Sequence, residues 1–333
     1  MNKSDISNSF CVVLNSSNVF SSFNSIYKYN FIQGGFNVPE DSKICVSQIT
    51  IPYSWFNVNA QVYNNAQFAI QYPTPGSNTY TTYNITLPNG FYQTSDINSY
   101  LQKQMIQLGL YLVSTTAGGP NLYFFNISTN ANYYTNQILT FLVPSTTANL
   151  ATLYPGYRIP TTADGGSAWI YGVGPTFYTT VSPATTVFQV LSSSSAFGTL
   201  IGYLPGSYPS TPITSNTANY STLGNTQPNA TPVNSLILRC NLIANSVTVP
   251  SDILDSVPIQ GATFGANINY SPSYEKWVDM IAGNYTSLSL TLQDQNFTQI
   301  QANDNNVLMV LYIKLGTKKK ILTYAGDKKN SFS

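Results

Sequence analysis

The sequence predicts an all-β sandwich with one helix and long connections. β-Branched and aromatic residues dominate the chain, which has 25 Tyr and 17 Phe among 333 residues, and these residue types favour strands over helices. Gly and Pro, with 21 and 19 residues, recur at short intervals and divide the chain into segments of strand length. About a dozen short strands with few helices are typical of an antiparallel sandwich, and the length allows one large domain or two ordinary ones.

The strands are expected where polar and apolar residues alternate between turn residues. In Ser287–Leu292 three leucines alternate with Ser and Thr, which predicts one buried face and one wet face. Residues 306–314 are almost continuously apolar, which indicates a central strand covered on both faces. The full set of expected strands is 9–15, 43–51, 66–72, 82–87, 121–127, 137–143, 185–191, 235–243, 263–270, 286–292 and 306–314.

One segment, residues 94–113, breaks this alternation. Its apolar residues recur at steps of three and four, as on one face of a helix: Ile97, Tyr100, Leu101, Met105 and Leu108. Thr94 or Ser95 can cap the N-terminus, and Gly109 can end the helix. The sequence therefore predicts one short helix here.

The domain organisation follows from two stretches that are rich in Gly and Pro and show little alternation, residues 144–184 and 204–234. We expect a discontinuous sandwich made of residues 1–143 and 232–316, interrupted by a loop-rich insertion at 144–231. Residues 317–333 form a basic C-terminal tail.

Charge is scarce. Charged residues make up 8% of the chain, against about 25% in ordinary soluble domains, and the formal net charge is +1. Between residues 97 and 251 only four residues are charged: Lys103, Arg158, Asp164 and Arg239. A neutral hydroxyl and amide surface repels itself weakly, which suits a protein that ends in a dense assembly.

The residue inventory excludes most catalytic devices. The chain has no histidine, so Ser–His–Asp and Cys–His catalysis and zinc sites with histidine ligands are impossible. Acidic residues close in sequence, Asp252 with Asp255 and Glu275 with Asp279, lie in turn-like contexts and are expected to be solvated. We expect no enzyme activity, no cofactor and no metal.

Cysteines and apolar runs indicate the compartment. Three widely spaced cysteines, Cys11, Cys45 and Cys240, predict free thiols in a reducing compartment rather than a disulfide framework. No apolar run reaches the length of a membrane span. The apolar stretch near the N-terminus, residues 10–14, is too short for a signal peptide, so no export is expected.

Five sequence motifs, taken in order, carry a family resemblance. They are Ile51–Asn57 (IPYSWFN), Leu87–Tyr92 (LPNGFY), Phe197–Pro209 (FGTLIGYLPGSYP), Pro232–Leu242 (PVNSLILRCNL) and Tyr285–Phe297 (YTSLSLTLQDQNF). Between about residues 44 and 314 the chain resembles the penton (minor capsid) proteins of polinton-like viruses, virophages and related small eukaryotic dsDNA viruses. The tail past residue 316 and residues 144–184 match nothing in the family pattern.

The resemblance implies a single antiparallel jelly roll with an insertion, and a structural role in the virion. Five copies are expected to close a homopentamer at each five-fold vertex of an icosahedral capsid and to contact the trimeric double-jelly-roll major capsid protein. Minor or cement proteins are further candidate partners, and no small-molecule substrate is expected. Such a protein assembles in the host cytoplasm or nucleus.

Two groups of residues are candidate contact sites. Tyr53, Trp55 and Phe56 directly follow a predicted strand, and they either fill the seam between neighbouring subunits or cover the end of their own sandwich. A second aromatic group with the same candidate role is Phe197, Tyr203 and Tyr208.

The basic tail is a candidate site for an anionic partner, either nucleic acid or an inner membrane face. Its lysines are Lys318, Lys319, Lys320, Lys328 and Lys329. The alternative is that they only keep the chain soluble.

Three alternatives to the penton interpretation stay open at this point. A carbohydrate-binding jelly-roll or adhesin module would use Tyr and Trp platforms with Asn and Asp. A β-sandwich hydrolase would need paired carboxylates. Another capsid component, either a double jelly roll or a minor protein, would also have this composition.

Overall fold

The computed structural model describes residues 9–32, 35–73, 79–144, 147–164, 184–213, 219–259 and 261–316. The chain forms two compact units: unit 1 comprises Met1–Trp55 and Val233–Ser333, and unit 2 comprises Phe56–Pro232. All strand pairings between the described strands are antiparallel. The prediction of an all-β fold is confirmed.

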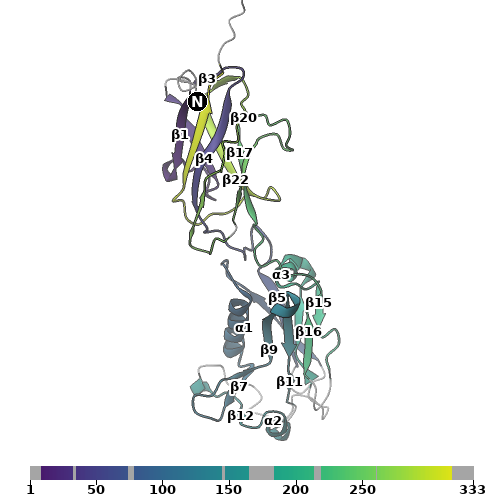
Figure 1. Cartoon of the computed structure of the whole chain (residues 1–333). Coiled ribbons are helices and arrows are strands. Elements are labelled where there is room, and N and C mark those ends of the chain that lie inside the picture. Colours follow the sequence, from purple (N-terminus) through teal and green to yellow (C-terminus); the bar gives the residue numbers. More distant parts are fainter. Residues whose placement is uncertain are drawn as a thin grey trace, which may run out of the picture. The chain divides into compact units, whose positions relative to one another are not determined.

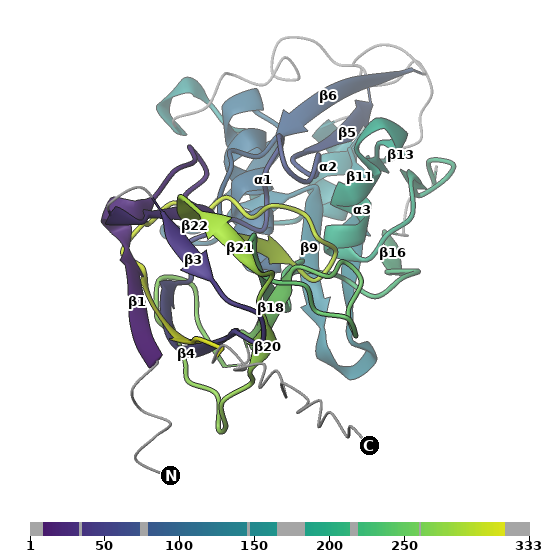
Figure 2. The same ribbon diagram turned by 90° about the horizontal axis from the view of Figure 1, so that it is seen from above.

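Unit 1 contains two sheets that pack into a sandwich (Figures 1 and 2). The first sheet has the order β1 (Ser9–Asn15), β23 (Leu308–Lys314), β4 (Lys43–Pro52) and β19 (Asn267–Tyr270), and β20 (Val278–Asp279) also pairs with β4. The second has the order β18 (Ile253–Pro258), β17 (Ser235–Cys240), β22 (Ser287–Asp294) and β2 (Ile26–Asn30). The pair of β3 (Phe36–Val38) and β21 (Gly283–Tyr285) continues the ladder between β2 and β22.

The strand order of unit 1 is that of a jelly roll. With β2 and β3, β19 and β20, and β21 and β22 each taken as one strand, the described part of unit 1 has eight strands in chain order. The first sheet then reads first, eighth, third, sixth, and the second reads fifth, fourth, seventh, second. Strands that alternate between two sheets in this way make two interlocked Greek keys. The connection between the third and fourth strands is unit 2.

The core of unit 1 follows the predicted alternation. Leu288, Leu290 and Leu292 on β22 are fully buried, and the Ser and Thr residues between them face outward. The expectation for residues 306–314 was wrong in one respect. Strand β23 is central in its sheet, but it is buried on one face only, because Met309, Leu311 and Ile313 point inward and Leu308 and Tyr312 are exposed.

In its described residues, unit 2 contains small sheets and three α-helices. One sheet has the order β15 (Gly206–Tyr208), β14 (Val187–Val190), β5 (Gln67–Pro73) and β6 (Tyr80–Thr86), and another has β16 (Tyr220–Leu223), β10 (Thr135–Thr140) and β9 (Phe125–Asn130). Two short sheets pair β12 (Tyr157–Arg158), β7 (Tyr111–Ser114) and β8 (Leu122–Tyr123), and β11 (Leu142–Val143) with β13 (Ala184–Thr185). The helices are α1 (Thr94–Leu108), α2 (Thr147–Leu153) and α3 (Ser195–Ile201).

Helix α1 lies alongside β9 (Figure 1) and buries the predicted face, Ile97, Leu101 and Met105. Gln93 is the N-cap residue instead of Thr94 or Ser95. Its backbone N–H donates to Asp96 Oδ2 at 2.8 Å, which places a negative charge in the first turn. Gly109 ends the helix in the left-handed conformation, with φ 70°.

The two units divide at a different place from the expected boundary between residues 143 and 144. Strands expected in the sandwich, such as 66–72 and 137–143, belong to unit 2. Their partners are in the segment taken for loops: β5 pairs with β14, and Phe68 stacks on Phe188 and Phe197 at centroid distances of 5.1 and 4.7 Å. The insertion therefore has its own aromatic core and begins at Phe56.

Candidate assembly surfaces

Tyr53 and Trp55 are core residues of unit 1 rather than surface residues. They follow β4, their rings lie 4.5 Å apart, and Tyr53 also contacts the ring of Phe264 at 5.9 Å. Their side chains are 5% and 2% exposed, so they have almost no area to offer a neighbouring subunit. Burial raises the pKa of Tyr53. Of the two roles considered for these residues, the structure supports covering the end of their own sandwich.

Phe197 and Tyr203 are core residues of unit 2 in the same sense. Phe197 stacks on Phe68, and both Phe197 and Tyr203 are fully buried. The Tyr203 hydroxyl donates to the carbonyl oxygen of Thr222 at 2.8 Å and accepts from the backbone N–H of Ile138 at 3.0 Å, and burial is the main cause of its raised pKa. The expectation of a subunit seam does not hold for these buried aromatics.

Phe56 and Tyr208 remain partly accessible. Both are half-buried. The Tyr208 hydroxyl donates to the carbonyl oxygen of Leu204 at 2.9 Å and accepts from Asn225 Nδ2 at 3.1 Å. These two residues keep their candidate role as contact residues.

The lysines of the tail, Lys318, Lys319, Lys320, Lys328 and Lys329, lie outside the described residues. Gly316, the last described residue before the tail, packs closely against the segment of Glu40 and Ser42. Its backbone N–H donates to Ser42 Oγ at 3.0 Å, and a side chain at this position would overlap the carbonyl oxygen of Glu40.

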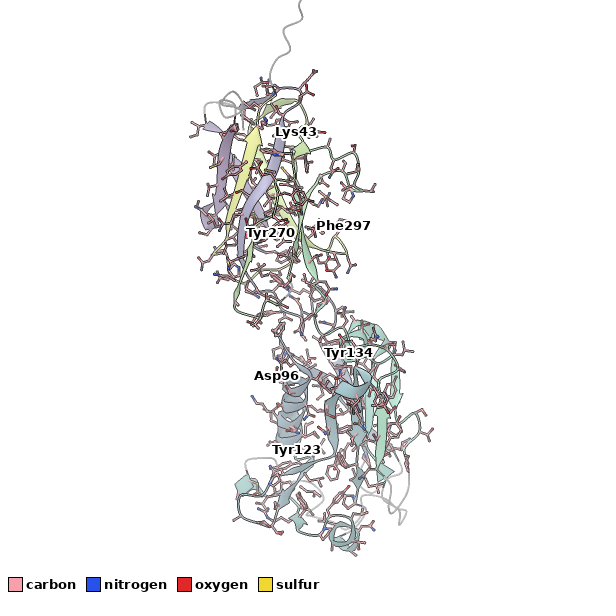
Figure 3. All side chains as sticks on the ribbon, viewed as in Figure 1. Lys43, Asp96, Tyr123, Tyr134, Tyr270 and Phe297 are labelled. Carbon is pink, nitrogen blue, oxygen red and sulfur yellow. The ribbon has the colours of Figure 1, made fainter. Side chains whose placement is uncertain are left out.

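Unit 1 has two distinct ends. At one end of the first sheet, Lys314 pairs with Ser9 on one side and with Lys43 on the other. The described chain therefore starts and finishes at this end. At the other end Ser54 accepts from the backbone N–H of Asp304 at 3.0 Å, next to the connection into unit 2. Figure 3 labels Lys43 at the first end and Tyr270 farther along unit 1.

The acidic residues do not form carboxylate pairs. Asp252 binds Arg239 with an N···O distance of 2.8 Å, Asp255 binds Lys276 at 3.0 Å, and Asp279 binds Lys43 at 3.1 Å. Glu275 accepts from Trp277 Nε1 at 3.1 Å. Each carboxylate therefore has a local partner that ties strands and loops together, and none is positioned opposite a second carboxylate for acid–base chemistry.

The cluster around Asp255 is the most buried of these. Asp255 Oδ2 also accepts from the hydroxyl of Tyr270 at 2.9 Å, and Lys276 Nζ lies 3.0 Å from the same hydroxyl. Hydrogen bonds to Tyr270 and Asp255 raise the pKa of Lys276. These contacts tie Asp255 on β18 to Tyr270 on β19 and to Lys276, which lies just before β20.

Within the described ranges no cluster of His, Cys, Asp or Glu could hold a metal ion. In the same part of the chain no helix is long and apolar enough to cross a membrane. Cys45 and Cys240 are buried, and burial raises the pKa of their thiols to about 11 and about 12. Cys11 is exposed.

Several apolar side chains that sequence reasoning missed are exposed on unit 1. On the outer side of the first sheet, β1 and β23 place Cys11 opposite Tyr312 and Val13 opposite Val310, and Leu308 lies at the end of the same row. Val13 is 43% exposed and Tyr312 is 38% exposed. We call these five residues the β1 face.

A second exposed apolar group lies on the loop of residues 245–250 between β17 and β18. Val247 is 88% exposed and Val249 is 93% exposed. In unit 2, Tyr133 and Tyr134 are exposed at the turn between β9 and β10, and Figure 3 labels Tyr134. There was little indication in the sequence that these side chains would be exposed, because isolated valines and tyrosines in a turn predict neither burial nor exposure.

The chain is similar to two solved structures over 92% of its length. One is the mavirus penton protein, at 8% identity, 98% coverage of that chain and a TM-score of 0.41. The other is a chain of the Sputnik virophage structure determined by cryo-electron microscopy, at 13% identity, 98% coverage and a TM-score of 0.36. No family model and no curated protein sequence matches the chain.

Proposed function

We propose that the chain is a structural capsid protein, a penton that forms homopentamers at the five-fold vertices of an icosahedral dsDNA virus and contacts the major capsid protein. The observation that carries the proposal is the single jelly roll of unit 1, whose eight strands follow the order of viral capsid domains. The five motifs between Ile51 and Phe297 support it as a resemblance.

The chemistry of the chain supports a role without catalysis. The chain lacks histidine, and the acidic residues that lie close in sequence, Asp252, Asp255, Glu275 and Asp279, are engaged in ion pairs or local hydrogen bonds. Exposed apolar residues on an otherwise neutral surface are typical of a protein that is covered by neighbours. The same chemistry supports a place in the virion beside the major capsid protein and minor or cement proteins.

The test is the mass of the recombinant chain by native mass spectrometry across salt and protein concentration. The subunit has a mass of 36.4 kDa, so a closed pentamer is easily separated from a monomer or trimer. We expect a pentamer. A stable trimer would contradict the vertex proposal and favour a major capsid or lectin-like assembly. Contact with the major capsid protein is tested by co-assembly with that protein from the same virus.

A second candidate function is glycan binding by unit 2. The specific observation is the exposed pair Tyr133 and Tyr134 on a turn flanked by neutral Asn and Thr residues, since tyrosine rings with amide neighbours can stack on sugars and hydrogen-bond to them. Binding on a glycan array that is lost in the double variant Tyr133→Ala and Tyr134→Ala supports this function. An array without any binding contradicts it.

A further inference from the structure

We propose that neighbouring copies of this chain join side to side through two different surfaces of unit 1, the β1 face of one copy and the 245–250 loop of the next. This inference rests on the proposed function, because it says where the contacts of the pentamer lie.

The β1 face lies beside an unprotected sheet edge, that of strand β1. Strand β1 pairs with β23 on one side and is the last strand of its sheet in the described chain. Proteins usually protect such edges with Lys, Pro or a bulge, but the strand SFCVVLN has no charged residue and no proline, and its register with β23 is regular. Its outward residues Cys11 and Val13 are exposed. A bare apolar edge of this kind indicates that another chain covers it.

The outer side of the second sheet is more polar than that of the first. On β22 the outward residues are Ser287, Ser289, Thr291 and Gln293. The neighbouring strand β17 adds Arg239, whose guanidinium binds Asp252 and Gln293. The two sheets of one sandwich therefore have different outer surfaces, and that of β1 and β23 is the more apolar.

Hydrogen bonds within the 245–250 loop stabilise a conformation in which its two valines are exposed. The backbone N–H of Asn245 donates to the carbonyl oxygen of Ser251 at 2.6 Å, and the backbone N–H of Val247 donates to Asn245 Oδ1 at 3.1 Å. Thr248 Oγ1 donates to the carbonyl oxygen of Pro250 at 3.0 Å. These bonds hold the loop in one conformation while Val247 and Val249 are almost fully exposed. A preorganised apolar tip loses little entropy when it binds.

The two surfaces lie on opposite sides of unit 1. The loop is attached to β20, since Ile243 pairs with Met280 and the backbone N–H of Ala244 donates to the carbonyl oxygen of Asp279 at 3.2 Å. Strand β20 pairs with β4 on the side away from β23 and β1, as Figure 1 shows. A contact between two different, oppositely placed surfaces is heterologous, and such a contact repeats into a closed ring when the rotation between neighbouring copies closes after a whole number of them.

Charge favours a second copy as the occupant. Among residues 9–30, on the β1 side, Lys28 is the one charged residue. In the segment 271–280, which leads into β20, Lys276 is bound to Asp255 and Asp279 to Lys43, and Glu275 is the carboxylate whose partner, Trp277 Nε1, is uncharged. The cationic side of one copy therefore meets the more acidic side of the next, and a single neighbour covers an exposed surface on both copies.

The test uses the native thiol of Cys11 as a probe. In the variant Val249→Cys, a short bis-maleimide reagent should link Cys11 of one copy to the new cysteine of the next. Cys45 and Cys240 do not interfere, because both are buried and their raised thiol pKa values keep them protonated. We expect a ladder of cross-linked species that ends at the pentamer under denaturing conditions.

Matched variants decide between specific and random linkage. The double variant Cys11→Ser, Val249→Cys should lose the ladder, and Leu204→Cys, which places a thiol at an exposed site of unit 2, should not give one. Linkage that persists without Cys11, or dimers alone, would overturn the inference.

Native mass spectrometry separates failure of this inference from failure of the proposed function. We expect Val247→Asp with Val249→Asp to convert the pentamer to monomers at an unchanged melting temperature, and Tyr133→Asp with Tyr134→Asp to leave it intact. If the wild type is a pentamer and the valine variant is too, the seam lies elsewhere and the proposed function stands. If the wild type stays monomeric at every concentration and no ladder forms, both are overturned.

Discussion

Unit 1 and unit 2 differ in the residues that stabilise them and in the number of charged residues that they contain. Unit 2 contains four charged residues, Asp96, Lys103, Arg158 and Asp164, and all the others lie in unit 1. Unit 2 is held by an aromatic core in which Phe68 stacks on Phe188 and Phe197. Unit 1 is a jelly roll whose loops are tied by ion pairs such as that of Asp255 with Lys276.

The difference indicates how each unit responds to its surroundings. Apolar burial is insensitive to salt and to pH near neutrality, whereas ion pairs weaken with screening or a change in protonation. We therefore expect unit 2 to depend on the packing of its core, and unit 1 to depend in addition on charge.

The largest expected effect comes from removing a ring from the core of unit 2. Phe188→Ala removes a fully buried side chain between two aromatic neighbours and should lower the free energy of unfolding of unit 2 by about 3–5 kcal/mol. Hydrogen exchange with mass spectrometry reads the two units separately. Peptides of unit 2 should lose protection while those of unit 1 keep it, and Leu290→Ala on β22 should do the reverse. Equal loss in both units for either variant would show that they unfold as one.

A smaller effect is expected from the buried cluster of unit 1. Asp255→Ala removes the carboxylate that accepts from the Tyr270 hydroxyl and from the Lys276 ammonium, and should lower the free energy of unfolding of unit 1 by about 1–3 kcal/mol. Since the folded state raises the pKa of Lys276, its contribution is complete below the ordinary lysine pKa of about 10.4 and is lost as pH rises beyond it. Denaturant titrations from pH 8 to 11 should show a steeper alkaline loss for wild-type unit 1 than for Lys276→Met; parallel curves would contradict this.

The ion pair of unit 2 gives a test at acid pH. Asp164 binds Arg158 with an N···O distance of 2.7 Å and accepts from the backbone N–H of Thr161 at 2.7 Å, and the first of these contacts is the main cause of its lowered pKa. Its contribution is present above the ordinary aspartate pKa of about 3.9 and is lost as pH falls below it. We expect a small loss of unit 2 stability below about pH 4 that is absent in Asp164→Asn. The same acid loss in both proteins would assign it to other groups.

The smallest effect on stability is expected from the tail. Truncation after Gly316 removes Lys318, Lys319, Lys320, Lys328 and Lys329 and should leave the melting temperature of both units unchanged. If nucleic acid is the anionic partner, the truncated protein should lose salt-dependent binding to duplex DNA, and so should a full-length variant in which these five lysines are replaced by Gln. Each lost phosphate contact reduces the slope of log binding constant against log salt concentration by about 0.9. Retained DNA binding, or loss of binding to anionic vesicles instead, would contradict this partner.

Local periodicity predicted the elements of both units but not their partners. The leucines of β22 and the face of α1 with Ile97, Leu101 and Met105 are where the sequence indicated. The same alternation in 66–72 and 137–143 showed that these strands bury one face, and it carried no information on which unit holds them. The aromatic stretch after β4 was ambiguous for the same reason, because Tyr53 and Trp55 suit a core and an interface equally well.

The sequence by itself determined that the chain is rich in antiparallel strands, has no histidine chemistry and has almost no charge between residues 97 and 251, because composition and short-range periodicity are local properties. Only the tertiary structure decided that β4 pairs with both β19 and β23, that residues 56–232 form a unit of their own, and that the outer side of β1 and β23 is apolar and uncovered. Pairing joins residues hundreds of positions apart, such as Val13 and Val310. Alternation of polar and apolar residues predicts that one face of a strand is buried, but the residues that bury this face come from a distant part of the chain.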